Sequence, residues 1–145
     1  MYRALNVARY IIERCHLQNK TISNLKLQKI LYFVQAEFLV SKNRPCFVER
    51  IEAWNFGPVV PEVYQQYKIF GSANIPVIGR RVNSVSISRE DKNLINGIVD
   101  ECSRYSASSL VDITHHQKPW IEAYSKPGYN NVISTESIRE YFSEE

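Results

Sequence analysis

The segment from Leu25 to Ser41 constrains the fold more than any other part of the chain, because its apolar residues nearly encircle a helix. The helical spacing of three and four residues is kept by Leu27, Ile30, Leu31, Val34 and Phe38. Further apolar side chains widen this stripe at Tyr32, Phe33 and Leu39. A helix that is apolar on most of its circumference must be covered on several sides. We therefore expect it to lie at the centre of the fold.

The length and composition indicate one soluble globular domain over residues 1–145. A chain of 145 residues is about one domain long, and 44% of its residues are hydrophobic and 23% charged. This composition excludes disorder, a collagen-like repeat or a coiled coil as a description of the whole chain. The net charge of +3 falls short of the basic surface expected of a dedicated nucleic-acid binder.

The cysteines and the apolar runs indicate a cytoplasmic protein. Cys15, Cys46 and Cys102 are odd in number and too widely spaced for a C-x-x-C pair, whereas a secreted scaffold carries a denser, even set. Charged residues interrupt the first apolar run, so it is not a secretory leader. No stretch reaches the ~20 apolar residues needed to cross a bilayer. We expect free thiols and no membrane partner.

Around the central helix, the patterns predict a mostly α, α+β domain with a small antiparallel β-ribbon. Helices are predicted over 4–15, 61–70, 89–105, 107–113, 119–125 and 135–142. Serines that can accept hydrogen bonds from the first backbone N–H groups precede three of them, namely Ser88, Ser106 and Ser134, and Ser88 with Asp91 resembles a capping box. The central helix has cap candidates at Thr21, Ser23 and Asn24. The ribbon is predicted to pair 47–54 with 82–88, and a turn is predicted at Gly57–Pro58.

Motifs for catalysis, cofactor binding or metal binding are missing from the sequence. His115 and His116 are adjacent, so on a helix their side chains point about 100° apart, and we expect one to be packed and one solvated. Glu90 and Asp91 suit a helix start rather than acid–base catalysis. The five glycines form no phosphate-binding loop. We therefore expect a protein without enzymatic activity, metal or cofactor.

A basic face is the one feature that favours nucleic acid. Basic residues bracket the central helix at Lys20, Lys26, Lys29, Lys42 and Arg44, and Arg80–Arg81 form a second cluster. Glu37 and Glu49 interrupt the first group, and a solvated helix face explains it better. One function that stays open is a DNA-binding regulatory module of a mobile element, although we do not expect a nucleic-acid partner.

Two aromatic–proline segments stand out as candidates for a groove. The first is WNFGPVVP over 54–61, in which Trp54 and Phe56 both need cover, and the second joins Thr114–His115 to Pro119–Trp120. Such segments form either a core corner or a groove for a ligand or partner, because large aromatic residues serve both purposes. We expect the first segment to contact the central helix, which also needs aromatic cover.

Three segments of the sequence resemble the Panacea domain, the SocA-like or GepA-like phage-associated protein family. SNLKLQKILYF over 23–33 resembles the family's NLKLQKLLYF signature, and IEAWNFGPVVPEVY over 51–64 resembles its IEAWxyGPVxPEVY segment. Thr114–His115 and Pro119–Trp120 resemble its TH…PW element. After Gln35 the chain departs from the family, where Gly-Trp or a similar pair often follows.

The resemblance implies a non-enzymatic, protein-binding antitoxin of a bacterial or prophage toxin–antitoxin system. It implies a cognate toxin as partner, and it leaves open a protease or chaperone and a homo-oligomer. A tight interface needs an aromatic or basic centre, and the candidates for it near the 54–61 turn and the central helix are Lys29, Tyr32, Trp54, Tyr64, Tyr67 and Trp120. The fold-determining motif residues are Leu27, Gln28, Gly57, Pro58, His115 and Pro119. Neutralisation by occlusion and neutralisation by delivery to a protease both stay open.

Overall fold

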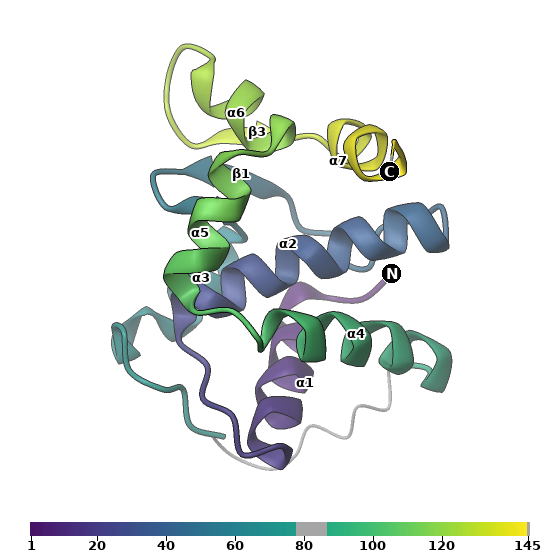
Figure 1. The fold of residues 1–145 in the computed structure, drawn as a ribbon, viewed down its shortest axis with the longest axis vertical. Coiled ribbons are helices and arrows are strands. Elements are labelled where there is room, and N and C mark those ends of the chain that lie inside the picture. The colour runs from purple at the N-terminus through teal and green to yellow at the C-terminus, as the bar shows by residue number, and fades with distance from the viewer. Residues whose placement is uncertain (78–86, 145) are drawn as a thin grey trace.

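The computed structural model describes residues 1–77 and 87–144, and Figure 1 shows their arrangement. Over these residues the chain is mostly helical with one small antiparallel sheet, as the sequence predicts. The elements in chain order are α1 (Ala4–Leu17), α2 (Asn24–Ser41), β1 (Ile51–Trp54), β2 (Gly57–Val59), α3 (Pro61–Tyr67), the 3-10 helix η1 (Lys68–Phe70), α4 (Arg89–Cys102), α5 (Ala107–His115), α6 (Lys118–Ser125), β3 (Asn131–Ile133) and α7 (Thr135–Ser143).

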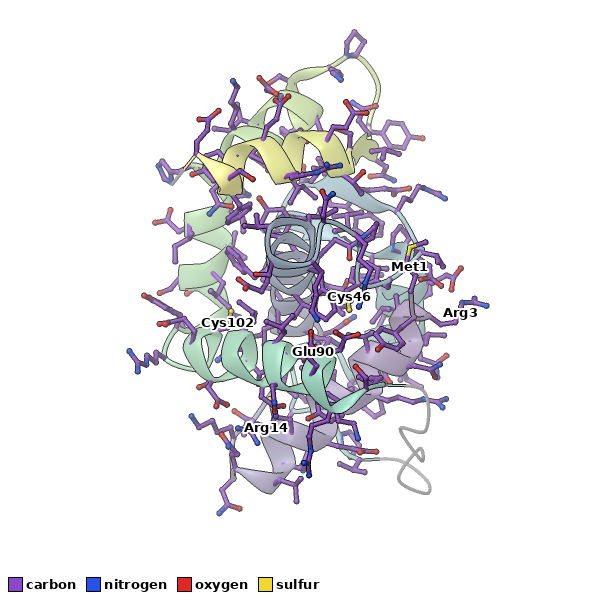
Figure 2. The ribbon with its side chains drawn as sticks, turned by 90° about the vertical axis from the view of Figure 1, so that its right-hand side faces the viewer. Met1, Arg3, Arg14, Cys46, Glu90 and Cys102 are labelled. Carbon is purple, nitrogen blue, oxygen red and sulfur yellow. The ribbon has the colours of Figure 1, made fainter. Side chains whose placement is uncertain are left out.

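Helix α2 lies at the centre of the fold, which confirms the prediction made from its apolar circumference. It contacts α1, α3, α4, α5, α7 and β2. Figure 2 views this helix end-on and shows other helices arranged around it. Its largest apolar side chains are almost completely buried, including Leu27, Leu31, Tyr32 and Phe38. The remaining elements therefore fold around α2 as a common support.

Helix α2 also buries amide side chains that hydrogen-bond irregular backbone. Gln35 Oε1 accepts from the N–H groups of Cys46 at 2.8 Å and Phe47 at 3.2 Å, and Gln35 Nε2 donates to the Phe47 carbonyl oxygen at 3.1 Å. Further toward the helix start, Gln28 Oε1 accepts from Val60 N–H at 2.9 Å. Buried backbone without a regular partner needs such side chains. The two glutamines thus fix the segments before β1 and after β2.

Serine hydroxyls begin helices α2, α4, α5 and α7, which confirms the predicted caps. Each accepts from the N–H three residues later at 3.1–3.2 Å, and the four are Ser23, Ser88, Ser106 and Ser134. The predicted capping box is only half formed, because the Asp91 carboxylate accepts from the Tyr2 hydroxyl and from Arg44 instead. Burial alone would raise the pKa of Asp91, but these hydrogen bonds outweigh it and the pKa is lowered.

The sheet corrects two details of the predicted ribbon. Its order is β2-β1-β3, and both neighbours are antiparallel to β1. The predicted partner strand at 82–88 falls largely outside the described residues, and the strand predicted over 47–54 begins only at Ile51. Gly57 and Pro58 belong to β2, where they pair with Trp54 and Ala53. The turn therefore lies two residues earlier than predicted, at Asn55–Phe56.

Candidate binding groove

The turn of the β1–β2 hairpin is held by side chains from α5 and α6. His115 Nε2 donates to the Asn55 carbonyl oxygen at 2.9 Å, and Trp120 Nε1 donates to the Trp54 carbonyl oxygen at 2.9 Å. The hydroxyl of Tyr124 donates to Asn55 Oδ1. The rings of these three side chains also pack in series, with Trp120 between the other two at centroid distances of 4.2 and 4.4 Å. The hairpin turn therefore has a rigid aromatic support.

The start of α2 fixes the other side of the same region. Asn24 Nδ2 donates to the carbonyl oxygen of Tyr64 at 3.2 Å, and Asn24 Oδ1 accepts from Gln28 Nε2 at 2.9 Å. The ring of Tyr64 meets that of Trp54 edge to face at a centroid distance of 4.9 Å. Because both amides are buried and bonded, Asn24 places α3, and Gln28 places Val60 directly after β2, relative to α2.

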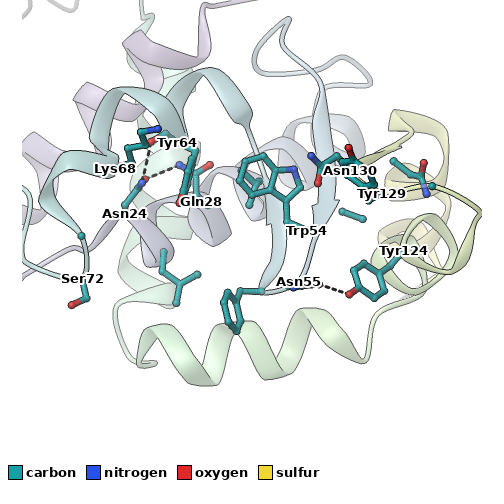
Figure 3. Close-up of a pocket in the computed structure, with 17 residues that line it drawn as sticks. Asn24, Gln28, Trp54, Asn55, Tyr64, Lys68, Ser72, Tyr124, Tyr129 and Asn130 are labelled. Carbon is teal, nitrogen blue, oxygen red and sulfur yellow. Dashed lines mark hydrogen bonds between the residues drawn. The ribbon is translucent and has the colours of Figure 1, made fainter.

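A groove of about 790 Å³ lies between these two supports (Figure 3). Trp54 stands in the middle, with Tyr64 and Lys68 on one side and Tyr124 and Tyr129 on the other. The lining comes from α2, the β1–β2 hairpin, α3, η1 and the turn after it, α6, the α6–β3 loop and the start of β3: Asn24, Leu25, Gln28, Ala53, Trp54, Asn55, Phe56, Val59, Tyr64, Lys68, Gly71, Ser72, Tyr124, Gly128, Tyr129, Asn130 and Asn131. Its size and its aromatic walls are those of a binding site.

The α6–β3 loop presents an exposed tyrosine to this groove. Asn131 Nδ2 donates to the carbonyl oxygens of Ala123 at 3.0 Å and Lys126 at 3.1 Å, which ends α6 and fixes the loop. Gly128 adopts a φ of 90°, which favours glycine. Tyr129 in this loop is 87% exposed, and Phe56, which also lines the groove, is 66% exposed. The cover predicted for Phe56 is therefore wrong, because the chain leaves this ring uncovered.

Comparison with known protein families gives a match that includes the β1–β2 hairpin and α5. The family model described as "Antitoxin SocA-like, Panacea domain" matches residues 27–121, which is more than half of the chain. The chain belongs to this family. The protein named Antitoxin SocA from Caulobacter vibrioides (strain NA1000 / CB15N) is 36% identical over 138 residues, which cover 86% of this chain and 71% of that protein. No solved structure matches the chain.

The Panacea-domain motif residues have distinct structural roles in this chain. His115 and Trp120 bond the hairpin turn, and Pro119 is buried at the start of α6. Gln28 bonds Val60, and Gly57 has a φ of 108° where β2 passes α2. These contacts give a physical reason why the motifs occur together, since each holds part of the same hairpin.

The structure brings together some of the predicted partner-binding residues and separates others. Trp54 and Tyr64 line the groove, and Trp120 lies behind it as support. Tyr32 and Tyr67 are buried, and with Lys29 they do not line the groove within the described residues. The exposed residues Phe56, Tyr124, Tyr129 and Lys68 were not predicted as partner-binding. An aromatic residue directly after Pro-Gly, as in KPGYN, was the available signal for Tyr129.

The side chain of Lys29 lies in the interior of the protein, which corrects its assignment to a basic face. Its side chain is fully buried, and Nζ donates to the Pro58 carbonyl oxygen at 3.1 Å. Loss of hydration on burial lowers the pKa of Lys29 to about 7. In the sequence, this lysine lies among apolar positions that nearly encircle α2. Because neighbouring elements cover α2 on most sides, a charged residue between these positions is buried with them.

We expect the stability of the protein to rise above pH 7 because of Lys29. Between the folded pKa of about 7 and the unfolded value of about 10.4, the unfolded chain binds a proton that the folded chain does not, so a higher pH favours folding. Urea unfolding at pH 7.5 and 9.5 should show a gain of up to about 3 kcal/mol in wild type relative to Lys29→Met.

Tyrosine and cysteine titrations are common to both proteins and cancel in this difference. Lys26→Met, at a partly exposed position three residues earlier on α2, serves as the control and should keep the wild-type pH dependence. Equal pH dependence in wild type and Lys29→Met would show that Lys29 stays charged and hydrated in the folded protein.

The remaining basic residues of the predicted face are dispersed. Arg44 bonds Asp91 at 3.0 Å, and Lys42 forms ion pairs with Glu90 and Asp91. Arg80–Arg81 lie outside the described residues. Because acids neutralise Lys42 and Arg44 and Lys29 is buried, the described residues give little support to the DNA-binding alternative.

The cysteines and histidines are placed as the sequence predicts. Cys15, Cys46 and Cys102 are free and buried, and burial raises the pKa of each thiol. His115 is half-buried in the aromatic support, whereas His116 is exposed. Residues 1–77 and 87–144 hold no cluster of three potential metal ligands. No helix in those ranges is long and apolar enough to span a bilayer.

Proposed function

We propose that this Panacea-domain protein is a non-enzymatic antitoxin that neutralises a toxin protein by binding it through the groove around Trp54. The membership of the family and the similarity to Antitoxin SocA support the antitoxin role. The observation that carries the binding site is the exposure of Phe56 and Tyr129, which both line the groove. Large aromatic rings left in solvent beside a concave surface are typical of protein interfaces.

The support behind the groove favours this proposal further. A binding centre gives most affinity when its side chains are already fixed before the partner arrives. The Trp54 carbonyl oxygen is bonded by Trp120, and Asn131 fixes the loop that carries Tyr129. The groove is therefore preorganised, and little ordering is needed on binding.

Co-expression with the product of the adjacent gene tests the proposal. Phe56→Ala combined with Tyr129→Ala should reduce co-purification of the toxin and its affinity by at least about tenfold, because exposed aromatic residues at an interface centre often contribute over 1 kcal/mol each. Growth should stop when the toxin is induced with this variant. Circular dichroism verifies that the variant is folded, which we expect because both rings are exposed.

Tyr105→Ala provides a matched control. This tyrosine follows α4, is 42% exposed and lies outside the groove lining, so its removal should leave rescue and co-purification at the wild-type level. If the folded groove variant still rescues growth and retains the toxin at wild-type yield, the toxin binds elsewhere.

A further inference from the structure

The charge of the groove limits what chemistry a partner can bring to it. Among the residues that the structure describes, Lys68 is the one charged side chain in the lining, and neither Asp nor Glu contributes. Lys68 is exposed at the end of α3 and takes part in none of the ion pairs formed by the described residues. An aromatic groove with one unpaired cation is complementary to an apolar group that carries a negative charge nearby.

An acidic residue close to Trp54 does not change this balance. Glu52 lies on β1, and its carboxylate accepts from Trp54 Nε1 at 2.9 Å and from Arg50 Nε at 2.7 Å. It is only 6% exposed. Because Glu52 is paired with Arg50 and does not line the groove, Lys68 stays the one charged side chain among the described lining residues.

Four of the five amide side chains in the described lining already make hydrogen bonds, and Asn130 is the exception, which favours a protein segment over a nucleobase as the occupant. Reading a base needs free amides aligned with its edge. Asn24 and Gln28 bond one another and the backbone at Tyr64 and Val60, and Asn131 Nδ2 bonds the end of α6. Recognition therefore depends mainly on the aromatic walls and on one lysine, which suits the side chains of a polypeptide.

Resting on the proposed function, we propose that the groove binds an acidic–aromatic segment of the toxin. An aromatic or aliphatic side chain of that segment packs between Trp54 and Tyr129, and a carboxylate beside it in the bound chain pairs with Lys68. Figure 3 shows Lys68 and Tyr129 on opposite sides of Trp54, so the two contacts are made by neighbouring parts of one extended segment rather than by one side chain.

A random dodecapeptide library displayed on phage tests the chemistry without knowledge of the toxin. Selection on the wild-type protein should enrich peptides with an aromatic residue near Asp or Glu. Selection on Lys68→Glu should instead enrich peptides with Lys or Arg, because the charge at the same groove is reversed. Lys20→Glu changes an exposed lysine outside the groove, so it should select the wild-type peptides.

Fluorescence anisotropy with the best selected peptide then measures the charge contact. Replacement of its acidic residue by the neutral amide, or Lys68→Glu in the protein, should weaken binding by about tenfold or more. Selection of no peptides, selection of peptides without acids, or equal affinities of the acidic and amide peptides would overturn the inference.

Co-purification of the toxin separates this inference from the proposed function. If Phe56→Ala with Tyr129→Ala loses the toxin while Lys68→Glu retains it at full affinity, the groove is the toxin site but the acidic partner is wrong. If the aromatic variant also retains the toxin, the proposed toxin site itself fails. Lys68 is exposed, so its reversal leaves the fold intact and the comparison valid.

Discussion

Gly57→Ala is expected to destabilise the protein by about 3–5 kcal/mol, one of the two largest effects of a single substitution that we expect here. The backbone at Gly57 has a φ of 108°, a conformation that side chains other than glycine rarely adopt. A Cβ at this position would lie 2.5 Å from Lys29 Cε and 2.9 Å from Thr114 Oγ1. Both neighbours are fully buried, so neither can move away without disturbing α2 or α5.

Gly97→Ala is the matched control, because the same change at this position has the opposite sign. Gly97 lies within α4, is exposed, and nothing lies within 4 Å of a Cβ added there. We expect it to stabilise the helix by up to about 1 kcal/mol. Urea unfolding of both variants measures the two effects, and similar stabilities would contradict the packing described for β2 against α2.

The double variant Gly57→Ala with Lys29→Met separates the two causes. Shortening and uncharging the lysine removes part of the steric conflict, but the strain of the φ at residue 57 stays. The second substitution should therefore recover only part of the lost stability. Full recovery would show that contact with Lys29, rather than backbone conformation, is why glycine is needed there.

Gln35→Ala is expected to lower stability by about 3–5 kcal/mol. It leaves the N–H groups of Cys46 and Phe47 and the Phe47 carbonyl oxygen without their partner in a region that is at most 1% exposed. Each buried polar group that loses its hydrogen bond costs about 1–3 kcal/mol. Chemical denaturation measures the loss, and near-ultraviolet circular dichroism checks that the native packing remains.

Gln66→Ala controls for the loss of a glutamine from a helix. Gln66 is exposed on α3, so its replacement should change stability by no more than about 0.5 kcal/mol. If Gln35→Ala has a similarly small effect, water replaces the lost hydrogen bonds and the segment before β1 is more open than its burial indicates.

The helical architecture could be predicted because its causes are local. The apolar spacing on α2 is visible in the sequence, and serine caps depend on residues within three positions of the helix start. Ser23, Ser106 and Ser134 accordingly cap as expected. The antitoxin family could be named for a different reason, because its motifs at 23–33 and 51–64 are long enough to match directly.

The sheet and the groove could not be predicted in full, because their causes lie far apart in the chain. Strand β3 is three residues long, and it pairs with β1 about eighty positions earlier. The prediction instead chose the alternating pattern at 82–88, which is a local signal. The groove likewise needs Trp54, Lys68 and Tyr129 to converge, and no spacing in the sequence expresses that convergence.

The sequence by itself determined the central helix, the helix starts and the family, since these follow from periodicity, local hydrogen bonds and continuous motifs. The tertiary structure decided which of the lysine and aromatic side chains are buried and which are exposed. Lys29 and Tyr32 lie on α2 and are covered by β2, α5 and α7, whereas Phe56 and Tyr129 occupy turns that none of the described elements covers. The physical reason is that burial depends on which elements pack together, and the same residue type serves equally well in a core or at an interface.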